Sequence, residues 1–338
     1  MVSGMVGAGN AQLPKMAGQF PSKAKKESRI KRFYRWLRNK RIQGQIYFPP
    51  FAEHLITSLA HLPLVLVIDG STTGRGCMTP MIGLIYKKRA LPLSWLTVEG
   101  KKGHLSRELH LELLRQVQPF IPKGTEVIFL GDGEFDGIEL QAFVDNQSWK
   151  YACRTAKNIV LELKGQQFRY EDMTDCMKPG QDFEAPDVLF SKERYGPVLA
   201  VGWWKKGEKE PIYLVSNMNS SEKACQWYAK RFTIETFFSD RKSRGFHIQK
   251  SHLFHPDRVS RLLIAACIAY HRVICLGGLA VRKGWDKIIH RTDRCDLSLF
   301  QLGLSLLDHF LLEDIDIPIP VDFGPCLFPS PVFRYQET

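Results

Sequence analysis

Residues 227–245 read WYAKRFTIETFFSDRKSRG, and four polar side chains in this stretch follow the spacing Y-x2-R-x3-E-x6-K. They are Tyr228, Arg231, Glu235 and Lys242. On a helix of about 3.6 residues per turn, these offsets lie within roughly 60° of the first residue, so one helix face would carry all four. A carboxylate beside a guanidinium, an ammonium and a phenol suits a metal ion next to a phosphodiester. A solvated face with i,i+4 ion pairs is the alternative interpretation.

The same stretch predicts how this helix begins and what it packs on. Asn219 and Glu222 form a candidate capping box at its start. Trp227, Ile234 and Phe238 lie on an adjacent stripe of the helix. That apolar stripe would anchor the helix to a core.

Two apolar runs upstream each end in an aspartate. Residues 62–68, LPLVLVI, precede Asp69, and residues 126–130, EVIFL, precede Gly131 and Asp132. Short runs of this kind, bounded by turn residues, predict buried strands, and open α/β sheets place their ligands at the carboxyl ends of strands. One such aspartate is often only a turn former. Two of them with a helix carboxylate predict a site for metal-dependent phosphoryl transfer, which needs several carboxylates.

The segments around these acids predict a single sheet. After the first strand come two apolar runs that a Lys87-Lys88-Arg89 turn would join into a hairpin, and helical and extended patterns then alternate. The predicted elements are strands at 81–86 and 90–98, a helix at 105–117, a helix at 138–144 and a strand at 149–153. Three antiparallel strands followed by helix, strand, helix and strand is the order of a ribonuclease H-like fold.

On these residues the sequence resembles the DDE transposases of bacterial insertion sequences, in the insertion sequence four group that carries the Y-x2-R-x3-E-x6-K signature. The resemblance spans residues 28–280. It implies that Asp69, Asp132 and Glu235 are the catalytic acids and hold two Mg²⁺ ions, for which Mn²⁺ can substitute. It also implies DNA as the partner, both the terminal inverted repeats and the target duplex, and a homodimer when assembled on DNA.

The resemblance further assigns residues that contact DNA. Tyr228, Arg231 and Lys242 would contact phosphates near the cut, and Arg154 matches a basic position near the active site. Residues 157–218 contain short β-branched and aromatic runs that predict a β insertion. Its Trp203-Trp204-Lys205-Lys206 segment could stack on an unpaired base. Tryptophans that merely close a small core are the alternative.

The basic charge of the chain is concentrated at its start. Residues 1–45 hold 11 Lys or Arg and a single acid, Glu27. Residues 23–41 interleave apolar side chains with bases and predict a helix with a basic rim that includes Arg32, Arg35 and Arg38. Such a helix would neutralise phosphates of duplex DNA, and the resemblance implies the same end-recognition function. A solvated tail or a membrane-surface helix is the alternative.

Other features exclude several classes of protein. Eight cysteines without a C-x-x-C pair indicate reduced thiols of a cytoplasmic protein, which for this family would be associated with the bacterial nucleoid. His247, His252 and His255 lack the cysteine partners of common zinc sites. Residues 262–281 are apolar enough for a membrane span, but His271 and Arg272 at their middle favour a core helix and no membrane partner.

Together these patterns predict an α/β protein with a ribonuclease H-like catalytic core interrupted by a β-rich insertion, and a basic α-helical N-terminal module. The predicted boundaries are 1–50 for the module, 60–156 and 219–281 for the core, 157–218 for the insertion and 282–338 for a region of uncertain function. The predicted function is DNA transposition by two-metal phosphoryl transfer. The alternatives are a truncated or domesticated relative that binds DNA without cutting, and a tyrosine recombinase with Tyr228 as its nucleophile.

Overall fold

The computed structural model describes residues 1–100, 105–175, 177–242 and 245–318, apart from the side chains of Arg241 and Lys242. The chain divides into two compact units, and each is described by itself. Unit 1 comprises Met1–Ser58, Thr73–Cys77 and Phe238–Thr338. Unit 2 comprises Leu59–Thr72 and Met78–Phe237.

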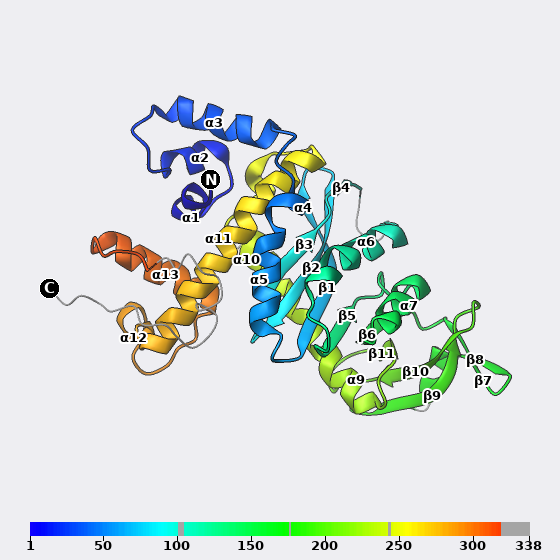
Figure 1. Ribbon diagram of the computed structural model, residues 1–338. Coiled ribbons are helices and arrows are strands. Elements are labelled where there is room, and N and C mark those ends of the chain that lie inside the picture. Colours follow the sequence, from blue (N-terminus) through cyan, green and yellow to red (C-terminus); the bar gives the residue numbers. More distant parts are fainter. Residues whose placement is uncertain (101–104, 176, 243–244, 319–338) are drawn as a thin grey trace. The chain divides into compact units, whose positions relative to one another are not determined.

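Unit 2 is built on a mixed sheet of eleven strands among the described residues (Figure 1). The strands are β1 (Leu64–Gly74), β2 (Cys77–Tyr86), β3 (Arg89–Trp95), β4 (Val98–Glu99), β5 (Val127–Gly131), β6 (Lys150–Thr155), β7 (Val160–Leu163), β8 (Gln166–Arg169), β9 (Asp182–Phe190), β10 (Tyr195–Trp203) and β11 (Ile212–Ser216). Their order is β3-β2-β1-β5-β6-β11-β10-β9-β7-β8, with β4 paired to β2. β1, β5 and β6 run parallel, and β2 and β3 form an antiparallel hairpin.

The chain is therefore an α/β protein with a large sheet, as predicted, and the first five strands of the core follow the predicted order. Several boundaries were wrong: β1 continues through Asp69 to Gly74 instead of ending at Ile68, β2 begins at Cys77 instead of residue 81, and β3 ends at Trp95 instead of residue 98. Residues 70–74, GSTTG, have no apolar alternation, so the pattern stops while the backbone pairing with β2 goes on. Strands β7 to β11, in the stretch predicted as an insertion, extend the same sheet through the β6–β11 pair.

Helices cover the sheet of unit 2 and fix its central strands in the core. They are α6 (Arg107–Val117), η1 (Gln118–Phe120), α7 (Ile138–Asn146), α8 (Tyr170–Thr174), α9 (Ser221–Tyr228) and η2 (Ala229–Phe232). α6 packs against β3 and α7 against β6, whereas α9 packs against β5, β6, β9 and β10. Leu66, Val67, Phe129 and Leu130 have no exposed surface. Apolar residues on both faces are expected where parallel strands are covered on both sides.

His110 of α6 makes the stability of unit 2 depend on pH. Its ring packs 4.4 Å from the Phe135 ring, and its Nε2 atom has no hydrogen-bond partner among the described residues. Burial lowers the pKa of His110 to about 4. The unfolded chain takes up a proton at this residue near pH 6.5 and the folded chain does not, so the contribution of His110 to stability is fully present above pH 6.5 and is lost as the pH falls toward 4.

We therefore expect His110→Leu to lose less stability than the wild type between pH 6.5 and pH 4. The difference should approach about 3 kcal/mol, at about 1.4 kcal/mol per pKa unit. Urea unfolding of both proteins across this pH range measures it. Parallel curves for the two proteins would show that His110 is protonated equally well in the folded chain.

Unit 1 is helical, and one long helix is its centre (Figure 1). Its elements are α1 (Val2–Ala8), α2 (Leu13–Gly18), α3 (Lys26–Arg38), α4 (Gly44–Tyr47), α5 (Pro49–Leu59), the second half of α10 (Thr233–Lys242), η3 (Ile248–Ser251), α11 (Pro256–Lys283), α12 (Asp286–Ile289) and α13 (Leu299–Leu312). α11 is the one helix in the described part of the chain with the length and composition of a membrane span. Its apolar window is 83% buried, which agrees with the prediction of a core helix.

Two features hold other helices of unit 1 to α11. Gly277 and Gly303 let α11 and α13 approach closely, because a Cβ at Gly303 would lie 1.8 Å from the Val273 carbonyl oxygen. Arg261 of α11 is buried, and its guanidinium donates hydrogen bonds to the carbonyl oxygens of Leu37 at 3.0 Å and Ile42 at 2.7 Å. One carbonyl in the last turn of α3 and one in the segment that follows it are thus satisfied by a side chain of α11.

Candidate active site

Asp69 and Asp132 lie side by side on neighbouring strands of unit 2. β1 and β5 are parallel with Val67 opposite Leu130, so each aspartate stands two residues beyond that pair. In each, Oδ1 accepts a hydrogen bond from the N–H of the following glycine, at 2.7 Å for Asp69 and 2.8 Å for Asp132. These bonds fix both carboxylates and leave Oδ2 of each turned toward a common neighbour.

That neighbour is the guanidinium of Arg231. Its Nη1 atom lies 3.6 Å from Oδ2 of Asp69 and 3.6 Å from Oδ2 of Asp132. Its Nη2 atom lies 3.5 Å from Oε1 of Glu235, one turn further along the chain. The structure thus brings the three predicted acids together around one positive charge. The Asp69 side chain is 5% exposed and that of Glu235 is 59% exposed, so the cluster reaches from the core to the surface.

The single helix predicted through this stretch was wrong. α9 ends at Tyr228, a 3₁₀ turn runs over η2, and α10 begins at Thr233. Residues three apart eclipse one another in a 3₁₀ turn, and the Arg231 guanidinium accordingly lies 5.8 Å from the Tyr228 ring. The predicted cap was wrong as well. Ser220, not Asn219, caps α9 and accepts a hydrogen bond from the Lys223 N–H.

The donor set fits a divalent cation in chemistry and in charge. Three carboxylates offer the hard oxygen ligands that Mg²⁺ prefers. All three lie around the positively charged guanidinium of Arg231. No group of three His, Cys, Asp or Glu side chains among the described residues is arranged to hold a metal ion.

Residues 60–271 match the family model of the transposase DDE domain, which is more than half of the chain. The chain belongs to the DDE transposase family. Members of this family generally use divalent metal ions, in agreement with the donor chemistry of the acid cluster. No curated protein shows significant similarity to this transposase.

Three solved structures resemble this DDE transposase. A cryo-EM structure of the piggyBac transposase synaptic complex with hairpin DNA matches with a TM-score of 0.45 and 14% identity, over 98% of this chain and 76% of that chain. Human ENDOV matches with a TM-score of 0.30 and 16% identity, over 60% and 91% of the two chains. The catalytic domain of human Endonuclease V matches with a TM-score of 0.28 and 14% identity, over 64% and 88%.

Tyr228 of this transposase is buried beside the acid cluster. Its ring has no exposed surface, and its hydroxyl has no hydrogen-bond partner in the described part of the chain. Burial raises the pKa of this phenol, and the nearby charge of Arg231 opposes the rise. A buried, protonated hydroxyl is unsuited to attack a phosphodiester. The predicted phosphate contact of Tyr228 remains a prediction.

Two further basic residues were predicted near the cut. Arg154 is exposed in β6, and its charge is close enough to Tyr228 to act on the pKa of that phenol. Lys242 ends α10, and its side chain lies outside the described residues. Arg154 is therefore on the same side of unit 2 as the acid cluster, and the assignment of Lys242 stays a prediction.

The two predicted tryptophans have different surroundings. Trp203 ends β10 with the Lys205 ammonium 4.2 Å from its ring, whereas Trp204 donates its indole N–H to the carbonyl of Glu208 at 2.9 Å. The Lys205 ammonium also lies 4.9 Å from the ring of Phe232. Sequence reasoning missed Phe232, which is 38% exposed although it directly follows Arg231 within the signature stretch. The signal that could have identified Phe232 is that it is an aromatic residue among charged neighbours in the sequence.

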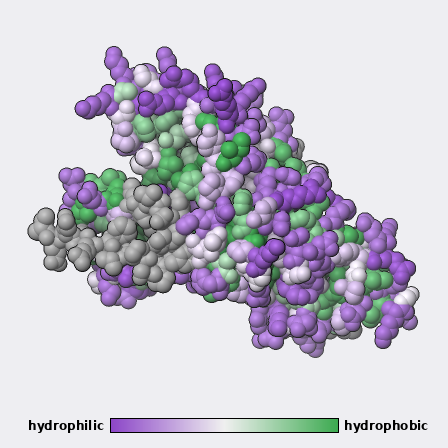
Figure 2. Space-filling view, in the orientation of Figure 1, coloured by the Kyte–Doolittle hydropathy of each residue, from purple (hydrophilic) through white to green (hydrophobic). Residues whose placement is uncertain are grey.

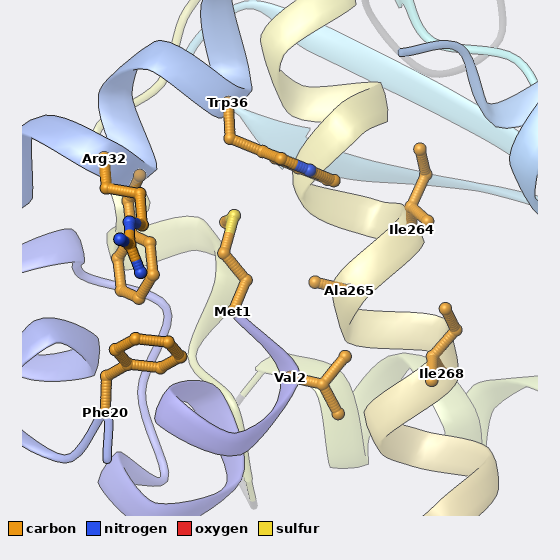
Figure 3. A pocket seen from close by; sticks show the side chains of 9 residues that line it. Met1, Val2, Phe20, Arg32, Trp36, Ile264, Ala265 and Ile268 are labelled. Atoms are coloured by element: carbon orange, nitrogen blue, oxygen red, sulfur yellow. The ribbon is translucent and has the colours of Figure 1, made fainter. Parts of the chain in front are cut away.

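The predicted DNA-binding residues of α3 belong to unit 1 and lie on two surfaces. Hydrophilic side chains cover α3 in Figure 2. Arg35 and Arg38 line a cavity of about 540 Å³ with Lys31 and Tyr34. Arg32 lines a different cavity of about 270 Å³, where Figure 3 shows it with Trp36 on the α3 side and the apolar side chains of α11 opposite.

Proposed function

We propose that this transposase cuts DNA at the ends of an insertion sequence and joins those ends to target DNA, with Asp69, Asp132 and Glu235 as its catalytic acids. One observation supports the proposal above all. Carboxylates from β1, from the end of β5 and from α10 lie within 3.6 Å of a single cationic group. Such convergence from three elements suits a phosphoryl-transfer site, where positive charge must meet a phosphodiester.

The proposed cofactor is two Mg²⁺ ions, for which Mn²⁺ can substitute. Bound ions supply Lewis-acid stabilisation of the phosphodiester oxygens and lower the pKa of a water molecule. Asp69, Asp132 and Glu235 would hold them. The two aspartates are suited to this because each is already oriented by the N–H of the next glycine.

The remaining residues of the site would bind and orient DNA. Arg231 presents a planar fork that can hold two oxygens of one phosphate, which a lysine cannot do. Arg154 and Lys242 would contact neighbouring phosphates. Tyr228 would contact a phosphate near the cut, and because its hydroxyl is buried we do not assign it as a nucleophile. The freed 3′ hydroxyl of the DNA would then be the next nucleophile, without a covalent protein–DNA bond.

The domain plan supports the same function. We propose that residues 1–50 are a DNA-binding module, that 157–218 are a β insertion with Trp203 near the bound DNA, and that the protein acts in the bacterial cytoplasm as a homodimer assembled on DNA. The basic face of α3 is suited to phosphate contacts. Residues 282–338 have no assigned chemistry.

The proposed chemistry is tested by the products of cleavage. Inverted repeats that flank the gene would supply the terminal DNA substrate. With Mg²⁺ we expect strand cleavage that leaves a free 3′ hydroxyl, and none when the cation is chelated. After denaturation the DNA should carry no attached protein. A covalent adduct that disappears in Tyr228→Phe would instead establish a tyrosine mechanism, and binding without any cleavage would establish a relative that only binds DNA.

The salt dependence of DNA affinity tests whether the basic surface of α3 binds DNA. Each phosphate contact adds about 0.9 to the slope of log K against log salt, so Arg35→Ala with Arg38→Ala should lower that slope by roughly two. Arg32→Ala removes the same charge from the other surface of α3, and a slope lowered by about one would show that this predicted DNA-binding residue contacts a phosphate as well. An unchanged slope in the double variant, with weaker binding to anionic vesicles, would identify α3 as a membrane-surface helix.

A further inference from the structure

We propose that Arg231 competes with divalent cations for Asp69, Asp132 and Glu235, so that its side chain must leave the acid cluster when a cation is bound there. The inference rests on the proposed function, because it takes these three acids as the cation ligands. It adds that one residue is both a counter-charge of the acid cluster and a ligand of the incoming phosphate. Cation uptake and phosphate binding would then be linked through a single side chain.

The position of the guanidinium is the first argument. It faces the same oxygens that a cation would use, Oδ2 of Asp69 and Oδ2 of Asp132, while Oδ1 of each is taken by a backbone N–H. Glu235 completes the set from α10. Two positive groups cannot share these oxygens at short range, because like charges a few ångströms apart repel strongly where water is excluded. The Arg231 side chain is 4% exposed, so water screens this repulsion poorly.

The quality of the contacts is the second argument. The distances of 3.5 and 3.6 Å are long for hydrogen bonds, and the Nε and Nη1 atoms of Arg231 have no hydrogen-bond partner among the described residues. Buried donors without acceptors are costly. Charge therefore holds the guanidinium in place without good directional bonds. A phosphate oxygen would satisfy donors that the carboxylates leave unsatisfied.

Two aromatic rings also lie beside the guanidinium of Arg231. Its guanidinium carbon lies 4.4 Å from the Phe232 ring, which is partly exposed, and 5.8 Å from the Tyr228 ring. Aromatic faces stabilise a guanidinium that loses a carboxylate partner. In the proposal, these rings would stabilise the guanidinium after it leaves the acids.

The test measures cation affinity of the full chain without DNA, by titration with Mn²⁺ followed by electron paramagnetic resonance. Arg231→Met keeps an unbranched side chain against the two aromatic rings but removes the charge. We expect it to bind Mn²⁺ about tenfold more tightly than the wild type. Lys230→Met is the matched control, since it removes the same charge from the next residue, which is exposed and stacked 3.7 Å from Trp227. It should stay within about twofold of the wild type.

The outcomes separate this inference from the proposed function. Equal or weaker Mn²⁺ binding in Arg231→Met, together with loss of binding in Asp132→Asn, would overturn the competition and leave the acid site intact. Unchanged binding in both Asp69→Asn and Asp132→Asn would overturn the acid site itself. If Arg231→Met does not fold, Arg231→Gln decides. It also removes the charge but keeps a polar side chain, so about tenfold tighter binding supports competition and wild-type affinity overturns it.

Discussion

Asp69→Asn, Asp132→Asn and Glu235→Gln are each expected to lower the rate of strand cleavage by about a thousandfold or more, while terminal DNA stays bound. The amides keep the size of each side chain and remove the charge that the proposed cations need. The predicted phosphate contacts come from other residues, so binding should survive. A Mg²⁺-dependent cleavage assay, with a gel-shift assay for binding, measures both quantities.

Asp136→Asn is the matched control for these variants. Asp136 lies four residues after Asp132, but its carboxylate accepts a hydrogen bond of 2.6 Å from the Thr155 hydroxyl instead of facing Arg231. Burial raises the pKa of this carboxyl, so the uncharged amide should be tolerated there. Wild-type cleavage in the control and loss in the three acid variants would locate the chemistry in the acid cluster. Full activity in any one acid variant would remove that residue from it.

Arg231→Lys is the second change with a large expected effect. It keeps the positive charge but loses the planar fork, so the scissile phosphate should be held less precisely. We expect cleavage at saturating Mg²⁺ to slow by about ten- to a hundredfold, since loss of one well-placed donor commonly costs that much or more. Single-turnover cleavage of terminal DNA measures the rate.

Lys230→Arg provides the comparison for this variant. It exchanges the same two residue types in the opposite direction, one position earlier and at the surface. Its cleavage rate should match that of the wild type. If Arg231→Lys also cleaves at the wild-type rate, only the positive charge of residue 231 matters at the acid cluster. The phosphate must then be held by other residues.

The three acids could be predicted because each has a local signal. Asp69 and Asp132 follow apolar strand patterns, and Glu235 stands in a spaced motif, so parallel pairing of β1 and β5 suffices to bring the aspartates together. Their meeting with Glu235 was predicted from the need of metal-dependent phosphoryl transfer for several carboxylates, whereas the position of Arg231 between the three acids was not. No local pattern encodes a contact between residues 69 and 231.

Several features had no sequence signal. The 3₁₀ turn at Ala229–Phe232 contains neither glycine nor proline, so helical periodicity runs through it unbroken. The inward direction of Arg231 follows from the carboxylates that it meets, which are set by tertiary contacts. The division of the α3 bases between two surfaces depends on how α11 packs against that helix. A helical sequence pattern predicts where each residue lies around the helix axis. It does not predict which other part of the chain packs against that residue.

The buried link from Arg261 to the end of α3 bears on how genetic screens of this protein should be interpreted. Arg261 is 6% exposed and its guanidinium is occupied by the Leu37 and Ile42 carbonyls, so it is a poor ligand for DNA. Its loss would nevertheless release the end of the helix that carries Arg35 and Arg38. A screen for binding-deficient mutants would therefore recover Arg261 together with true contact residues. Only a separate measure of folding, such as protease resistance of the α3–α4 connection, would tell the two groups apart.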